Sequence, residues 1–220
     1  MKQLSLALYL EGPTDERFLP VIIQRAANRV LSQRALAVVE VIEPLVLRPS
    51  SKVQGNAERI FSVARQARGY DILIVHRDAD ARTPDRALER YFKPGLKLVQ
   101  TSKEDVCREL IPIIPIRMTE AWMMADVEAF RDVAGTDLSA EQLGFPLRPR
   151  QVESIRDPKH ELNMALDQIF ARRRRRKRVR LGQYYGPLAR RIRLDELDNV
   201  PAFRQFTKDL VNLLAAMRFI

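Results

Sequence analysis

The sequence has few of the residues on which several common kinds of site depend. A single cysteine, Cys107, excludes a framework of disulfides within the chain, and with only two histidines it also excludes a zinc finger. No apolar run approaches the roughly 20 residues that a membrane-spanning helix needs. Met1 leads directly into an alternating apolar segment, so no signal peptide is expected. These absences predict a cytoplasmic protein without a membrane partner.

Acidic residues are missing from the stretch 172–193, which holds eleven lysines or arginines. The whole chain has a formal net charge of +10, so the rest of it carries −1, because 10 minus 11 is −1. This local positive charge indicates a polyanionic partner, with nucleic acid ahead of a membrane and an acidic protein face as the alternative. Tyr184 and Tyr185 follow the densest part and could stack on bases. The residues expected to contact nucleic acid are Arg172, Arg173, Arg174, Arg175, Arg176, Lys177, Arg178 and Arg180.

Strand and helix patterns alternate through residues 1–134, which predicts an α/β core with a parallel sheet. Strands are expected over 4–10, 35–47, 72–75 and 110–116, the last at an edge because it contains two prolines. Helices are expected over 18–31, 55–68, 84–92, 102–110 and 118–130. Residues 135–220 are predicted to form a helical extension packed on this core, with helices over 161–170 and 202–219.

Three acids follow two of the predicted strands. Glu11 ends the first strand, and Asp78 and Asp80 follow the strand at 72–75. The carboxyl ends of parallel strands meet at one edge of a sheet, so the three carboxylates are expected close together. Residues i and i+2 of an extended segment point the same way, so both aspartates can face one cation. Their hard oxygen ligands suit Mg²⁺ or Mn²⁺.

Nearby polar residues each have a structural explanation beside a functional one. Asp15 lies one helical turn after Glu11 and is either a further metal ligand or a helix cap. His76 either orients a carboxylate or makes a structural hydrogen bond, and Arg77 balances the acidic charge. Glu120 either approaches the metal or is an acid favoured at the start of a helix.

Two segments with these acids resemble the motifs of a known family. "YLEGPTDERFL" resembles the glutamate motif of the Toprim fold, which topoisomerases, DnaG-type primases and the overcoming-lysogenization-defect nucleases share. "ILIVHRDAD" resembles its D-x-D motif, at a matching separation along the chain. The segments "IPIIPIRMTEAWMMAD", "DPK" and "PAFRQFTKDL" extend the resemblance, now to a bacterial family of Toprim-like proteins, over nearly the whole chain.

The resemblance implies a four-stranded, mostly parallel sheet flanked by helices, and a Mg²⁺-dependent nuclease. Glu11 would act as metal ligand or general acid and base, and Asp78 and Asp80 would bind Mg²⁺. In the related nucleases further acids and a lysine complete a two-metal site. Asp15 matches the first of these acids by spacing. The remaining candidates are Glu120 or Asp126 for a carboxylate, and Lys159 for the lysine.

The resemblance also bears on partners and on rival functions. Proteins of this kind work beside an ATPase in bacterial defence against phages, and the chain has no phosphate-binding loop of its own, so a separate ATPase is expected. The nucleic acid is expected to be DNA rather than RNA. One rival is a non-catalytic module that binds nucleic acid or a protein partner. Another is a phosphatase with a D-x-D-x-T motif, which Arg82 disfavours because it stands where threonine is needed.

Overall fold

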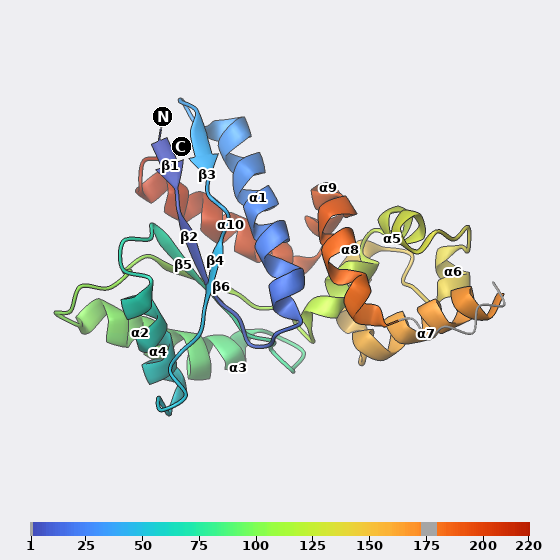
Figure 1. Ribbon diagram of the computed structural model, residues 1–220, viewed down its shortest axis with the longest axis horizontal. Helices are drawn as coiled ribbons and strands as arrows, with labels where there is room; N and C mark the ends of the chain where they lie inside the picture. Colours follow the sequence, from blue (N-terminus) through green and yellow to red (C-terminus); the bar gives the residue numbers. More distant parts are fainter. Residues whose placement is uncertain (1, 173–179) are drawn as a thin grey trace.

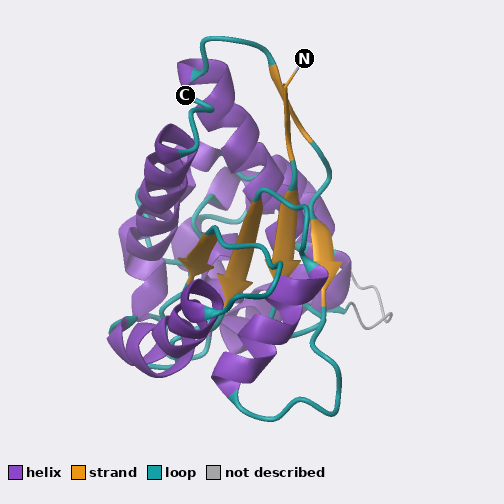
Figure 2. Ribbon diagram, turned by 90° about the vertical axis from the view of Figure 1, so that its left-hand side faces the viewer, coloured by secondary structure: helices purple, strands orange, loops and turns teal. Residues whose placement is uncertain are grey.

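The computed structural model describes residues 2–172 and 180–220. At its centre is a sheet with the spatial order β4-β2-β5-β6, in which every pairing is parallel (Figure 2). Its strands are β2 (Leu6–Tyr9), β4 (Leu45–Leu47), β5 (Ile72–His76) and β6 (Leu110–Ile113). A separate parallel pair consists of β1 (Lys2–Leu4) and β3 (Val39–Val41). The predicted α/β fold with a parallel four-stranded sheet is confirmed, and β6 lies at an edge as expected.

Helices cover both faces of this sheet because its strands are apolar on both faces. Along β2, Leu6 and Leu8 belong to one buried cluster, whereas Ala7 and Tyr9 belong to another. This is the two-residue alternation of a strand. The first face is covered by α1 (Leu19–Arg34) and α10 (Pro201–Ala216), and the second by α2 (Asn56–Gln66) and α4 (Lys93–Thr101) (Figure 1).

Five further helices lie beyond α1, on the side of the molecule away from α2 and α4 (Figure 1). They are α5 (Val127–Ala134), α6 (Ala140–Leu143), α7 (Pro158–Arg172), α8 (Tyr185–Arg191) and α9 (Leu194–Leu197). Their apolar residues join the cluster that already holds α1, α10 and one face of the sheet. The described residues before and after position 135 therefore share one hydrophobic cluster, which α10 completes by returning to β6.

Short helical turns connect these elements. They are η1 (Asp15–Arg17), α3 (Asp85–Ala87), the π-helix η2 (Leu88–Phe92), η3 (Thr119–Met124), η4 (Pro149–Ser154) and η5 (Leu181–Gln183). Within the described ranges, no helix is both long and apolar enough to cross a membrane.

Four predicted elements differ from the structure. The strand expected over 4–10 is broken at Ser5, so that Leu4 belongs to β1 and residues 6–9 belong to β2, in different sheets. The strand expected over 35–47 is divided into β3 and β4, which lie in different sheets, and Pro44, which cannot donate a ladder hydrogen bond, lies in the break. The helix expected over 102–110 is absent, because α4 ends at Thr101 and an extended segment leads into β6. The helix expected over 118–130 is interrupted, because Asp126 accepts a hydrogen bond from Ala129 N and caps a new helix, α5.

Candidate functional site

The loops after β2 and β5 leave the sheet side by side. The two strands are neighbours, and Tyr9 is in register with Val75. Asp78 N donates a hydrogen bond of 3.0 Å to Glu11 Oε2. Arg77 Nη1 lies 3.0 Å from Glu11 Oε1. The expected meeting of Glu11 with the aspartate segment is thus confirmed, and Arg77 balances the charge of Glu11.

His76 lies at the centre of the site and is completely buried. Its Nδ1 accepts a hydrogen bond of 3.4 Å from Glu11 N, so the proton of a neutral imidazole is on Nε2. That Nε2 lies 3.3 Å from both Thr119 Oγ1 and Asp78 Oδ1. Nδ1 also faces Asp15 Oδ2 at 3.8 Å. One buried ring therefore touches the loops of both strands and the start of η3.

Asp78 has an unusual environment for an aspartate. Its Oδ1 is buried and makes no hydrogen bond within the described residues, and His76 Nε2 lies 3.3 Å from it. Burial raises the pKa of this carboxyl to about 6, and the negative charges of Asp15 and Glu11 act in the same direction, while His76 partly opposes them. A carboxylate with an unsatisfied buried oxygen favours the approach of a cation or a proton.

The extended geometry expected for Asp78 and Asp80 is wrong. The strand β5 ends at His76, and Asp80 has a φ of 48°, in the left-handed region. An aspartate tolerates this conformation better than most residues. Asp80 is exposed and makes no ion pair with a described residue, whereas Asp78 turns inward toward His76. The two carboxylates nevertheless line the same hollow.

Asp15 is buried and has a role different from a helix cap. Its Oδ2 accepts a hydrogen bond of 3.1 Å from Gly12 N, which lies before it in the chain. The cap position of η1 is Thr14, whose side chain makes no capping bond. Asp15 therefore fixes the turn that carries Glu11, and it adds negative charge beside His76.

Glu120 is buried and is held by the C-terminal helices. Tyr185 OH donates to Glu120 Oε1, and burial, followed by this hydrogen bond, raises the pKa of Tyr185. No described contact joins Glu120 to Glu11 or Asp78. The expected stacking of Tyr185 on bases is wrong, because the residue is only 1% exposed.

Two other candidates lie apart from these acids. Asp126 caps α5 and accepts hydrogen bonds of 2.9 Å from Arg193 Nε and Nη2, so it is a structural residue. Burial raises its pKa, but the hydrogen bonds from Arg193 outweigh burial and the net pKa is lowered. Lys159 is exposed in the first turn of α7, and its ammonium contacts no acid among the described residues.

The fit of a metal ion depends on how many protein ligands are required. Among residues 2–172 and 180–220, no three acidic, histidine or cysteine side chains are arranged to hold one. The two-metal cage that the resemblance implies is therefore not formed by the described side chains alone. Mg²⁺, however, often takes only one or two carboxylates and completes its shell with water and substrate phosphates. The unsatisfied Oδ1 of Asp78 fits such an open site.

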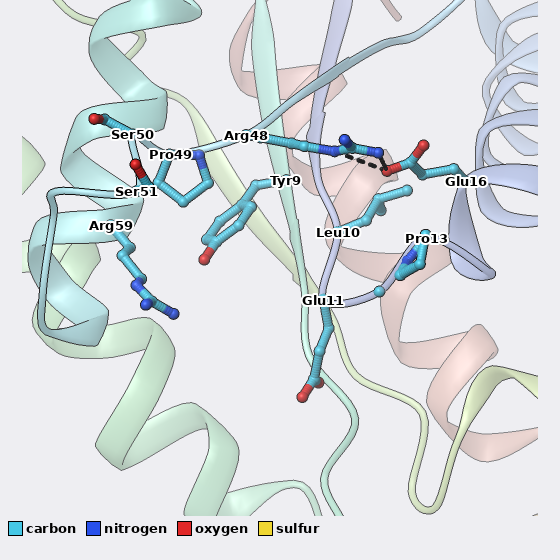
Figure 3. A pocket seen from close by; sticks show the side chains of 11 residues that line it. Tyr9, Leu10, Glu11, Pro13, Glu16, Arg48, Pro49, Ser50, Ser51 and Arg59 are labelled. Atoms are coloured by element: carbon cyan, nitrogen blue, oxygen red, sulfur yellow. Dashed lines mark hydrogen bonds and ion pairs between the residues drawn. The ribbon is translucent and has the colours of Figure 1, made fainter.

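A hollow of about 380 Å³ lies beside Glu11, on the side of α2 (Figure 3). Arg59 enters it from α2, with its Nε bonded to Val53 O, which leaves its terminal nitrogens free of described partners. Arg48, which follows β4, turns to Glu16. The hydroxyl-bearing residues Ser50 and Ser51 complete the rim. Guanidinium and hydroxyl groups around a hollow next to an acid are typical of a phosphate-binding surface.

The arginine run falls largely outside the described residues. Residues 173–179 are not described, and neither is the side chain of Arg172. Arg180, at the far end of the run, is exposed, and Arg17 Nη1 donates a hydrogen bond of 3.1 Å to Gly182 O. Since Arg17 belongs to η1, the chain just after the run is attached to the helical turn that carries Asp15.

Several residues of this region were not identified from the sequence. Thr119 bonds to His76, and Glu153 accepts hydrogen bonds from Trp122 Nε1, Ile116 N and Ala202 N. Nothing local to Glu153 indicates that it is buried, since its partners lie 31 to 49 residues away along the chain. Arg86 and Arg90 line the same hollow as Asp78 and Asp80. The sequence contains a signal for this pair, because two arginines four residues apart in a predicted helix lie on one helix face.

No curated protein and no solved structure matches the chain. One family model does, and it extends from the loop of Glu11 through most of α10, so it includes the site and the helices that enclose it. By this match over residues 10–211, the chain belongs to the family described as a domain of unknown function (DUF4276).

Proposed function

We propose that the protein is a Mg²⁺-dependent nuclease that hydrolyses phosphodiester bonds of nucleic acid, DNA rather than RNA. The observation that carries the proposal is the junction of Glu11 and Asp78. Two acid-bearing loops on neighbouring parallel strands are tied by a hydrogen bond of 3.0 Å, and a buried carboxylate oxygen of Asp78 accepts no hydrogen bond from a described residue. The carboxyl edge of a parallel sheet is where α/β proteins place such groups.

Asp78 would hold the Mg²⁺, with Asp80 and Glu11 as the nearest further carboxylates. When bound, the ion supplies charge neutralisation at the phosphate and a lowered pKa for an attacking water. Glu11 retains lone pairs beyond those that Arg77 and Asp78 N occupy, so it can accept a proton from water. His76 positions both loops through its contacts with Glu11 N and Asp78. Asp15 serves as a supporting residue beside His76, and Glu120, which Tyr185 holds, is a further supporting acid.

The positive side chains around these acids would hold the nucleic acid. Arg59, the exposed Arg180 and the arginine run supply charge for the backbone. Phosphate contacts of this kind are insensitive to sequence and weaken as salt rises. Lys159 would contribute only as a further exposed cation.

The test is a cleavage assay with labelled single- and double-stranded DNA and RNA, in Mg²⁺, Mn²⁺ or EDTA. Asp78→Asn and Glu11→Gln are expected to lower the rate at least about 100-fold, as loss of a group that acts in the transition state does. Asp167→Asn and Glu43→Gln make the same substitutions at exposed positions and should cleave like the wild type. Equal activity of Asp78→Asn and the wild type would contradict the proposal.

The second candidate is a non-catalytic module that binds nucleic acid or a partner protein. It is favoured by one observation, the lack of a three-ligand metal site among the described side chains. It predicts salt-sensitive binding that survives Asp78→Asn and Asp80→Asn, and no heat signal when Mg²⁺ is titrated into the protein. Metal-dependent cleavage would eliminate it.

The proposal extends to a separate ATPase partner and to defence against phages, on the resemblance alone. Co-purification of the native protein with an ATPase, and loss of phage resistance in Asp78→Asn cells, are the expected results. A protein that purifies alone and protects no host contradicts this extension without affecting the cleavage test.

A further inference from the structure

A second hollow, of about 360 Å³, lies between the aspartate segment and the helical residues of α3 and η2 that line it. Asp78 and Asp80 line one part of it, and Arg77, Arg86 and Arg90 line another. The hollow thus holds three guanidinium groups and two carboxylates. It is separate from the hollow that Arg48 and Arg59 line.

One of the three arginines is fixed in place. Arg77 pairs with Glu11 at 3.0 Å, and its guanidinium carbon lies 5.0 Å from the centre of the Tyr91 ring. Stacking on an aromatic ring and pairing with a carboxylate together restrict the side chain. The wall of the hollow next to Asp78 is therefore preorganised and positively charged.

The other two arginines are exposed and have no described partner. Arg86 and Arg90 are four residues apart on the continuous helical segment of α3 and η2, so they project from the same face. Neither makes a hydrogen bond or an ion pair with any described residue. The nearby acid Glu89 is engaged by Lys93.

Opposite charges in this hollow do not pair with one another. Neither Arg86 nor Arg90 forms an ion pair with Asp78 or Asp80 among the described contacts, although all four line it. Two sets of opposite charges that share a hollow without touching leave space for a ligand between them. An anionic group that contacts the arginines fits this space. Planar guanidinium groups match phosphate oxygens especially well.

We propose that Arg86 and Arg90, backed by Arg77, form a phosphate-binding subsite beside Asp78 and Asp80. Its placement as the neighbour of the reacting phosphate rests on the proposed nuclease function, but phosphate binding itself does not. The ligand is a phosphate group of nucleic acid, either an internal phosphodiester or a terminal phosphomonoester. In both cases the subsite fixes which bond of the strand lies next to Asp78.

The test measures binding without turnover. A labelled single-stranded DNA oligonucleotide is titrated in EDTA, as a function of salt, against the wild type and the Arg86→Gln/Arg90→Gln variant. The variant is expected to bind at least about tenfold more weakly, the change that loss of one charge-assisted hydrogen bond produces. Its slope of log K against log salt should also become shallower by about 1 to 2, because fewer phosphates are neutralised.

The matched control is Arg34→Gln/Arg218→Gln, which removes the same charge elsewhere. Arg34 ends α1, and Arg218 O accepts a hydrogen bond from Lys2 beside β1, at the amino-terminal end of the sheet. This control is expected to bind within about twofold of the wild type. If both double variants weaken binding equally, or neither does, the subsite is disproved. All four arginines are exposed, so unchanged melting temperatures will verify that both variants fold.

A further comparison identifies the form of the phosphate. If the ligand is a terminal phosphate, the wild type prefers a 5′-phosphorylated oligonucleotide over its 5′-hydroxyl form, inorganic phosphate competes, and Arg86→Gln/Arg90→Gln loses that preference. If it is an internal phosphodiester, the variant weakens the binding of both oligonucleotides equally.

Asp78→Asn separates the subsite proposal from the nuclease proposal, because it should abolish cleavage and retain binding. Weakened binding by the arginine variant in a protein that never cleaves supports the subsite and rejects the nuclease.

Discussion

At the scale of single residues, the structure separates acids that hold the fold together from acids that are available to a ligand. Every oxygen of Asp126 and Glu153 accepts at least one hydrogen bond from a described residue. Asp78 Oδ1 accepts none. Buried polar groups without partners are rare in folded proteins, and they concentrate where a site awaits a ligand or stores strain.

Asp78→Asn is expected to stabilise the protein at neutral pH in EDTA. Burial raises the folded pKa of Asp78 to about 6 from 3.8, so the folded protein binds the proton more tightly than the unfolded chain. The wild type therefore carries a penalty that is fully present above pH 6 and absent below about pH 3.8. The gain should be about 3 kcal/mol at pH 7, because 6 minus 3.8 is 2.2 and each pKa unit corresponds to about 1.4 kcal/mol.

The measurement is urea unfolding of both proteins at pH 7 and at pH 4. The difference in the free energy of unfolding should shrink markedly at pH 4, where the wild-type carboxyl is protonated in the folded state. A gain that is equal at both pH values would show that the carboxylate is not strained by burial.

At the scale of elements, α2 and α4 pack so closely that only glycine fits at one contact. A Cβ at Gly95 would lie 2.6 Å from Ile60 Cδ1 and 2.7 Å from Ile60 Cβ. The second of these atoms is attached directly to the backbone of α2, so rotation of the side chain cannot remove the clash. The close approach closes the hydrophobic cluster on this face of the sheet.

Gly95→Ala is therefore expected to destabilise the protein by about 1 to 3 kcal/mol, as overpacking does in other cores. The sign is informative, because alanine in place of glycine within a helix otherwise stabilises by up to about 1 kcal/mol. Gln100→Ala, at an exposed position of the same helix, is the control and should change stability little. Chemical denaturation measures both, and a stabilising Gly95→Ala would refute the close packing.

At the scale of the whole molecule, α1 connects the sheet to the C-terminal helices through its arginines. Arg25 Nη1 donates to Ala189 O, and Arg29 pairs with Asp195 and Asp198. Beneath these contacts, one apolar cluster includes both the sheet and α10. The chain is thus expected to unfold as a single cooperative unit.

Phe206→Ala tests this expectation. Phe206 is buried in α10 beside Phe203, and truncating a buried phenylalanine costs about 3 to 5 kcal/mol. Fluorescence of the single tryptophan, Trp122, and far-UV circular dichroism should report the same lowered transition, because Trp122 stacks edge-on against Phe203. Met164→Ala, at a half-exposed position, is the control. Two separate transitions would show that the core is not one unit.

The sequence alone determined the architecture of the sheet region and the meeting of its acids. The alternation in β2 and the apolar run of β5 are local patterns, and in a parallel α/β fold such strands end at the same edge. Glu11 and the aspartate segment could therefore be placed together before any contact was known. The same reasoning made residues 35–47 one strand, because an apolar run does not say to which sheet each half belongs.

Only the tertiary structure decided what each acid does. Asp78 turns inward, Asp80 takes a left-handed conformation, Glu120 is held by Tyr185, and Asp126 is held by Arg193. These outcomes depend on burial and on partners as many as 67 residues away. The ionisation and availability of a carboxylate are set by the groups around it in space, and a linear sequence does not specify that surrounding.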